Sequence, residues 1–286
     1  LMIRRPPRST PKPSSAASDV YKRQSEAKDP FSWLNTLPKP WTLNNQDFEY
    51  HLKKIHEQYP EFDSRLIAIN LWRVGTPYGL FCLGEENEKD NDPIIRYDSS
   101  DCTVHVLTTL AYAKTYSLKD AKKSMIEIHY KPNEQNLKVP SYNYRWHFTS
   151  DRILNHPMNV NITDLIIDPK YTEQVNIELN KKHNGELFLD IDWSLNETIS
   201  FIPTDKIDAD VMKKLPPICG IAFVKRDYFK LGILIAHEGY VLNRSNLVHA
   251  SSELKKTVNV DLLEYIKQDG NYRFDGAMFF ELDPIN

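Results

Sequence analysis

Three cysteines occur in the 286 residues, and one of them has a setting that favours nucleophilic chemistry. Cys102 follows the N-cap residues Ser99, Ser100 and Asp101 and precedes a helical apolar pattern. A cysteine in the first turn of a helix lies at the positive end of the helix dipole, among backbone N–H groups without intrahelical partners. Both features stabilise a thiolate, which is the reactive form of cysteine. The alternative for Cys102 is a small buried hydrophobic residue.

Two histidines twelve residues apart provide a candidate base. His237 ends the apolar run 231–236, which predicts a buried central strand, and His249 follows in the next strand after a turn at 243–246. A histidine in a buried strand needs partners for its ring nitrogens, so His237 is either a core histidine or a catalytic base. Because side chains alternate along a strand, the two imidazoles share a face only if the loop has an odd number of residues or a bulge intervenes.

The other two cysteines lack such a setting. Cys82 begins a loop and Cys219 precedes a strand, so we interpret both as structural or unassigned. The sequence does not decide whether these two pair in a disulfide. No cluster of cysteine, histidine and aspartate has the spacing of a zinc site, and we therefore expect no metal or other cofactor.

The composition is typical of a globular chain, with 41% hydrophobic, 26% charged and 11% aromatic residues. The net charge of −3 lacks the strongly basic footprint of a nucleic-acid-binding protein. No apolar run approaches the roughly 18 residues of a membrane helix. We therefore expect a monomer with no nucleic-acid partner and no membrane span.

Residues 1–24 differ from the rest, with six Lys and Arg against a single Asp. They are rich in proline and show neither a helical nor an alternating pattern, which predicts disorder. They resemble translated sequencing-adapter sequence, and we interpret them as a non-native leader. A basic arm that binds nucleic acid or membrane is the alternative. The apolar core of a signal peptide is missing from this segment.

The elements that position these residues follow from local patterns. Residues 25–44 are expected to form an extended lead-in, and residues 45–286 a single domain. Apolar spacing and capping residues predict helices at 45–59, 66–72, 102–111, 117–129, 149–155, 205–215 and 260–267. Strands are predicted at 160–168, 175–179, 186–190, 198–202, 221–225, 232–242, 247–250 and 272–281. The acidic run at 85–92 is interpreted as a solvated loop. Helices that precede strands favour the α+β class over alternating βαβ units.

These motifs resemble the NlpC-type superfamily of papain-like cell-wall cysteine hydrolases. The matching motifs are Asp101-Cys102, His237-x-Gly239-Tyr240 and Val248-His249-Ala250-Ser251. Further motifs are similar to one branch, the N-acetylmuramoyl-L-alanine amidase-like family: Gly-Thr-Pro-Tyr at 75–78, Arg-Trp-His-Phe at 145–148 followed by Asp151, and Leu-Leu-Glu-Tyr at 262–265. The resemblance covers residues 45–284 and implies a papain-like fold, with helices packed on a mainly antiparallel sheet.

The resemblance also implies roles for individual residues. Cys102 would be the nucleophile, His237 the general base and His249 the residue that orients the base. Residues implied to line the substrate cleft are Tyr78, Ser100, Asp101, Arg145 and His147. For Arg145 a structural ion pair with Asp151 is the alternative. His237 would take the proton of Cys102, unless the two already form a thiolate–imidazolium pair.

The implied reaction is hydrolysis of an amide bond in bacterial peptidoglycan, either the muramoyl–L-alanine bond or one within the stem peptide. The partners would then be peptidoglycan or muropeptide fragments, and the protein would be periplasmic or secreted. Three departures from the family leave the substrate preference open. Glu238 stands where the family has an apolar residue, and the helix after Cys102 lacks the family's acidic residue. The third is Gly220-Ile221, where the family has Gly-Asp before the preceding strand. An acyl-transferring enzyme on the same triad and a non-catalytic cell-wall-binding module are the alternatives.

Overall fold

The structure, a computed structural model, describes residues 29–83 and 95–282. The chain divides into two units, residues 1–36 and residues 37–286. The described part of the first unit contains the 3₁₀ helix η1 (Ser32–Thr36). The elements below belong to the second unit. The leader predicted at 1–24 and the acidic loop predicted at 85–92 lie outside the described residues.

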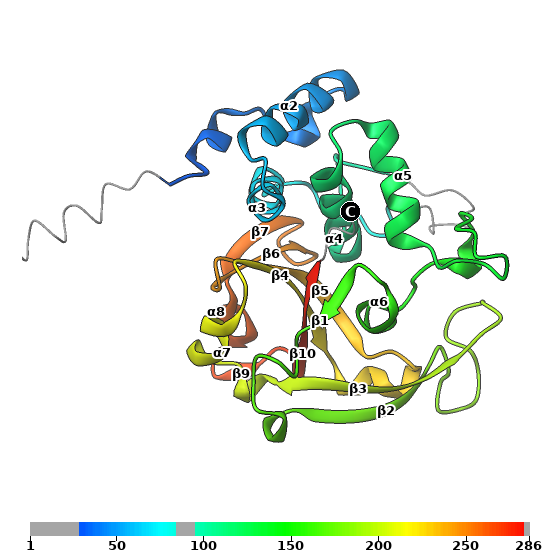
Figure 1. Ribbon diagram of the computed structural model, residues 1–286. Helices are drawn as coiled ribbons and strands as arrows, with labels where there is room; N and C mark the ends of the chain where they lie inside the picture. The colour runs from blue at the N-terminus through cyan, green and yellow to red at the C-terminus, as the bar shows by residue number, and fades with distance from the viewer. Residues whose placement is uncertain (1–28, 84–94, 283–286) are drawn as a thin grey trace, which may run out of the picture. The chain divides into compact units, whose positions relative to one another are not determined.

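Helices come first in the second unit (Figure 1). They are η2 (Pro40–Thr42), α2 (Asn45–Gln58), α3 (Phe62–Trp72), α4 (Cys102–Lys114) and α5 (Leu118–His129). The side chains of Asn44, Asp101 and Ser117 each accept a hydrogen bond from the backbone N–H three residues on, which caps α2, α4 and α5. Helix α4 contacts α3, α5 and the sheet, so most of its surface is buried. The four α-helices predicted in this part are confirmed.

Strands dominate the rest of the unit: β1 (Asn159–Asn161), β2 (Glu173–Leu179), β3 (Leu195–Pro203), β4 (Ile218–Val224), β5 (Ile235–Leu242), β6 (Asn246–Ser251), β7 (Lys256–Asp261) and β10 (Gly276–Leu282). They form one sheet in the order β2-β3-β10-β4-β5-β6-β7, with β1 beside β10, and every pair is antiparallel. Strands β8 (Lys267–Gln268) and β9 (Asn271–Tyr272) make a small separate hairpin. The α+β prediction with a mainly antiparallel sheet is therefore confirmed.

Short helices connect the strands: η3 (Tyr142–Tyr144), α6 (Thr149–Asn155), η4 (Pro169–Tyr171), η5 (Thr204–Lys206), α7 (Ala209–Lys214), η6 (Arg226–Leu231) and α8 (Leu262–Ile266). Helix α6 has the predicted bounds. The helix predicted at 205–215 is split into η5 and α7, and the one predicted at 260–267 is shortened to α8 because β7 extends to Asp261.

Four strand predictions were wrong in extent or type, and three of them lie outside β5. Residues 186–190 form an irregular loop, because the Asn180 side chain binds the backbone N–H of Leu189 and competes with a ladder. The strand predicted at 160–168 ends at Asn161, whose side chain accepts from Thr163 N and begins a turn. The strand predicted at 272–281 is divided between β9 and β10.

Only the last two residues of the apolar run before His237 belong to a strand, so the strand predicted at 232–242 is shortened at its start. Residues 226–231 form η6, which ends at Gly232 in the left-handed conformation (φ 72°). Strand β5 begins only at Ile235, so His237 lies near its start rather than at the end of a central strand. At this position the His237 side chain lines a cavity.

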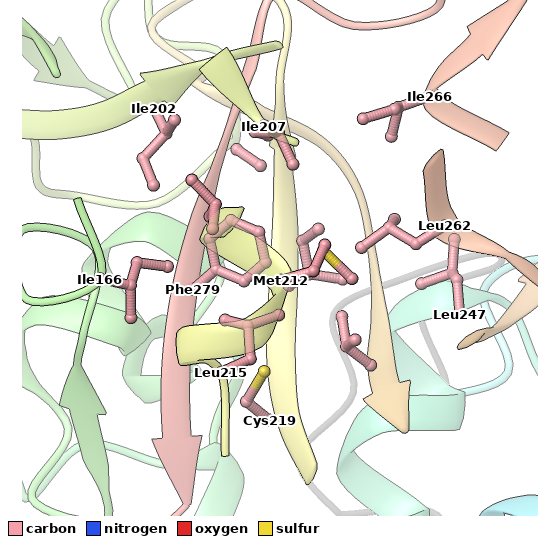
Figure 2. Packing of buried hydrophobic residues seen from close by; sticks show 14 of the residues in the cluster. Ile166, Ile202, Ile207, Met212, Leu215, Cys219, Leu247, Leu262, Ile266 and Phe279 are labelled. Atoms are coloured by element: carbon pink, nitrogen blue, oxygen red, sulfur yellow. The ribbon is translucent and has the colours of Figure 1, made fainter. Parts of the chain in front are cut away.

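The two faces of the sheet contribute to different clusters of buried residues. On β4, Cys219, Ile221 and Phe223 pack with side chains of α7 and α8, and Figure 2 shows this cluster around Met212, Leu262 and Phe279. The alternate residues of β4 pack instead with β2, β3 and α6. Cys82, Cys102 and Cys219 are all free thiols, and Cys219 is part of the core.

Candidate active site

The start of α4 is held by one carboxylate. Asp101 Oδ1 accepts a hydrogen bond from Val104 N at 2.8 Å, and Oδ2 accepts one from Phe81 N at 3.2 Å. The carboxylate thus caps the helix and also fixes the loop that precedes it in space. Cys102, the first residue of α4, is half-buried and lines a cavity of about 440 Å³.

The histidine pair satisfies the condition set by strand alternation. Three residues, 243–245, separate β5 from β6, and Tyr240 lies opposite Val248. Continuing this register places His249 opposite Gly239, on the same face as His237. His237 Nε2 lies 2.8 Å from His249 Nδ1, which makes a hydrogen bond between the rings.

Two local features let the rings meet. A Cβ on Gly239 would lie 3.0 Å from His249 Cβ and 2.8 Å from Val248 O, so a glycine is needed for this close approach. The pairing of β4 with β5 shifts between Phe223 and Val224, just where His237 follows Ala236. Such a bulge bends the strand and re-aims the side chains beside it.

Cys102 and His237 line the same cavity. No hydrogen bond joins Cys102 Sγ to His237 within the described part of the chain, so the two side chains share the cavity without direct bonding. Because His249 occupies Nε2, Nδ1 is the ring nitrogen of His237 that remains for proton transfer. The ring of Tyr265, from α8, packs against that of His249, with the two ring centroids 4.6 Å apart.

The electrostatics favour a neutral pair. Burial raises the pKa of the Cys102 thiol to about 12, and the Asp101 and Glu238 carboxylates add to this shift. Burial lowers the pKa of His237 to about 3, assisted by His249 and Arg273. At neutral pH the free protein therefore holds a thiol and a neutral imidazole. This is opposite to the thiolate expected from the helix dipole, because desolvation outweighs the dipole at a buried helix start.

The structure brings some of the other predicted residues to the cavity. Tyr78, Asp101 and His147 line it. His147 Nε2 lies 2.6 Å from Tyr142 O, and burial lowers the pKa of this histidine to about 4. The ring of Tyr78 is partly exposed, and burial raises its pKa.

Ser100 and Arg145 are fully buried and are not among the described lining residues. The backbone of Ser100 pairs with that of Tyr78 in an isolated β-bridge, so Ser100 supports the position of Tyr78 without lining the cavity itself. Arg145 donates to Leu83 O at 2.7 Å, and Leu83 itself lines the cavity. Asp151 forms an ion pair with Lys131 instead of the one weighed with Arg145.

Sequence reasoning missed two further features. His129 lines the cavity with only 4% of its surface exposed, and neither ring nitrogen has a partner among the described residues. Its only sequence signal is a histidine in the last turn of a helix. Glu238, noted as a departure, is also buried, and it accepts hydrogen bonds from Thr103 and Thr149 and pairs with Arg152.

Neither a metal site nor a membrane-spanning helix is found in the described residues. Over 29–83 and 95–282, no group of three His, Cys, Asp or Glu side chains is placed to hold a metal ion. No helix within these ranges is both long enough and apolar enough to span a bilayer.

The geometry defines an α+β protein in which a cysteine at a helix start and a histidine from an antiparallel hairpin line one cavity, with a second histidine hydrogen-bonded to the first. A family model described as AmiA-like, N-acetylmuramoyl-L-alanine amidase-like, matches residues 69–271. The chain therefore belongs to the N-acetylmuramoyl-L-alanine amidase-like family. No curated protein matches the sequence.

Solved structures share this fold. The protein LPG0564 from Legionella pneumophila, of family DUF1460, aligns with a TM-score of 0.65 and 22% identity, over 84% of this chain and 97% of that one. An N-acetylmuramoyl-L-alanine amidase from Bacteroides uniformis ATCC 8492 aligns with a TM-score of 0.60 and 20% identity, over 78% of this chain and 99% of that one. At these identities the likeness concerns the fold.

Proposed function

We propose that the protein is a papain-like cysteine amidase that hydrolyses an amide bond of bacterial peptidoglycan. Cys102 is the nucleophile, His237 the general base and His249 the residue that orients it. The observation that carries the proposal is the single cavity lined by both Cys102 and His237, with His249 bonded to the far nitrogen of His237. Membership in the amidase-like family supports the same reaction.

The mechanism starts from neutral groups. His237 Nδ1 takes the thiol proton as Cys102 Sγ attacks the amide carbonyl, and His237 Nε2–H donates to His249 Nδ1. Because Asp101 occupies the N–H of Val104, the N–H groups of Cys102 and Thr103 are the ones left at the helix start for the oxyanion. His237 then protonates the leaving amine. Water hydrolyses the thioester and restores the thiol.

The cavity lining indicates which part of the substrate it holds. The described lining residues include no Lys or Arg, and the Asp101 carboxylate already accepts hydrogen bonds from two backbone N–H groups. Stem-peptide carboxylates would be desolvated there without a partner, which is costly. Aromatic rings line the cavity from several elements: Tyr78, Phe81, Tyr142, Trp146, Phe148 and Phe188. Such a lining suits an uncharged N-acetylated sugar ring, and we assign the scissile bond to the muramoyl–L-alanine amide.

Peptidoglycan lies outside the cytoplasmic membrane, so we place the activity in the periplasm or the extracellular space. The substrates are peptidoglycan or muropeptide fragments. This placement is part of the functional proposal and is tested with it.

Cys102→Ala tests the proposal. Removing the thiol removes the covalent step, so release of peptides with a free N-terminal alanine from purified murein should fall to background. Mass spectrometry of the soluble products measures this release and identifies the bond. Cys82→Ser is the matched control, since Cys82 is a buried free thiol that does not line the cavity, and it should retain activity.

Unchanged release by Cys102→Ala would contradict the nucleophile assignment. Wild-type protein that binds murein but releases nothing would indicate a binding module instead. Transfer of the acyl group to an added amine in preference to water would indicate an acyl-transferring enzyme.

A further inference from the structure

A buried carboxylate lies directly behind the proposed base. Glu238 follows His237 on β5 and is 1% exposed. Strand alternation turns its side chain to the opposite face of the sheet from His237, where α4 packs. Its Oε1 accepts hydrogen bonds from Thr103 Oγ1 at 2.9 Å and Thr149 Oγ1 at 3.1 Å, and its Oε2 pairs with Arg152.

The hydrogen bond between Thr103 and Glu238 connects the residue that follows the proposed nucleophile to the residue that follows the proposed base. Thr103 follows Cys102 at the start of α4, and Glu238 follows His237 at the start of β5. These positions are 135 residues apart in the chain, so only a tertiary contact can hold them in register. Thr149 and Arg152, both on α6, hold the same carboxylate from a third element.

Stability alone is a poor explanation for this arrangement. Desolvating a carboxylate and a guanidinium costs several kcal/mol per ion, and apolar side chains of similar volume are often as stable or more so. Arg152 is itself only 3% exposed, so both charges are removed from water. The ion pair instead orients the carboxylate of Glu238. Hydrogen bonds to an oriented carboxylate fix the distance between the groups that donate them.

We propose that Glu238 is a positioning residue that holds Thr103, and with it Cys102, at a fixed separation from His237. This inference rests on the proposed function, since it assigns a role in the reaction of Cys102 and His237. Arg152 pairs with the carboxylate and orients it. Misplacement of reacting groups by about 1 Å can reduce a rate by two orders of magnitude.

The same carboxylate acts on the charge state of the nucleophile. It lies close enough to Cys102 to raise the pKa of the thiol, after burial and Asp101. The titratable and charged groups around Cys102, from all the elements that face it, are Asp101, Glu238, Arg152, His237, His129, His147, Tyr78 and Tyr265. Removing the charge of Glu238 therefore stabilises the thiolate.

Alkylation of Cys102 by iodoacetamide, followed against pH, tests the charge effect without any substrate. The wild-type rate should rise with pH as the thiolate forms. Glu238→Gln, which keeps the shape of the side chain and removes its charge, should shift the profile to lower pH. No shift, or a shift to higher pH, in a Glu238→Gln protein that keeps the wild-type circular dichroism would overturn the charge effect.

Thr103→Val tests the positioning without a change in charge. It removes one hydroxyl at constant shape, so we expect kcat to fall at least about tenfold with KM unchanged, and Thr103→Ser to restore it. Thr108→Val is the matched control on the same helix, because Thr108 bonds Val104 O and not Glu238. An unchanged kcat in Thr103→Val beside an active wild type refutes the positioning role alone. An inactive wild type refutes the proposed function, and the alkylation profiles still report on Glu238.

Discussion

At the scale of single residues, His129 stands out as a buried polar side chain of the cavity wall. It is buried in the cavity wall with both ring nitrogens unpaired among the described residues. A buried polar group without a partner costs about 1–3 kcal/mol. Burial and the neighbouring Arg145 hold its pKa well below the usual value, so the ring is neutral at physiological pH. A neutral imidazole offers one donor and one acceptor to an uncharged group such as an amide or a hydroxyl.

His129→Leu should therefore weaken substrate binding without affecting the chemical step. We expect KM for a soluble muropeptide to rise by up to about tenfold at unchanged kcat, the equivalent of about one hydrogen bond. The melting temperature should stay the same or rise, since an unsatisfied buried group is removed. Steady-state kinetics and thermal unfolding measure both effects. A fall in kcat at constant KM would assign His129 to the reaction instead.

At the scale of elements, the β5–β6 hairpin decides whether the histidines cooperate. An odd loop of three residues brings His237 and His249 to one face, and Gly239 leaves room between them. Asn243 and Arg244 both adopt positive φ, 51° and 60°, which makes the tight turn possible. The geometry of the base therefore depends on the backbone of the hairpin as much as on the two imidazoles.

Gly239→Ala should disrupt this geometry. Its Cβ would contact His249 Cβ at 3.0 Å and backbone atoms of β6 at 2.8 Å, so the strands must separate locally. We expect a loss of about 1–3 kcal/mol in the free energy of unfolding and a marked fall in kcat. Urea denaturation and murein release measure the two effects. A variant with wild-type stability and activity would show that the close approach is not required.

At the scale of the whole molecule, several histidines are buried in the neutral form. The pKa is lowered by burial, to about 4 for His147, His156 and His249 and to about 3 for His237. The pKa values of His105 and His129 lie well below the usual value for the same reason. Below about pH 6.5 the unfolded chain binds protons that the folded chain does not, so protonation favours unfolding.

Stability should therefore be complete above about pH 6.5 and fall as the pH decreases toward 4. His156 lies outside the cavity and is 4% exposed, and its share is up to about 3 kcal/mol near pH 4. Thermal unfolding between pH 4 and pH 8 measures the trend, and His156→Gln should flatten it. A melting temperature that is constant across this range would contradict the neutral burial of these histidines.

An element could be predicted from the sequence when the residues that determine it lie close together in the chain. Caps and apolar spacing predicted α2, α4, α5 and α6, because those signals lie within one or two turns of the chain. Residues 186–190 form a loop, although their own pattern predicted a strand. The prediction failed because the Asn180 side chain, several residues earlier, determines the course of this segment. The start of the strand before His237 was predicted too early, because a 3₁₀ helix continues into the apolar run and ends at Gly232.

The sequence by itself determined that Cys102 begins a helix behind an aspartate cap and that two histidines lie on successive strands. These features depend on neighbours in the chain, which capping and alternation make readable. Tertiary structure alone decided that burial raises the pKa of the Cys102 thiol, that the His129 ring nitrogens have no partner among the described residues, and that Glu238 contacts Thr103. Desolvation and a hydrogen bond across 135 residues exist only once distant segments have packed together, and no local pattern records either.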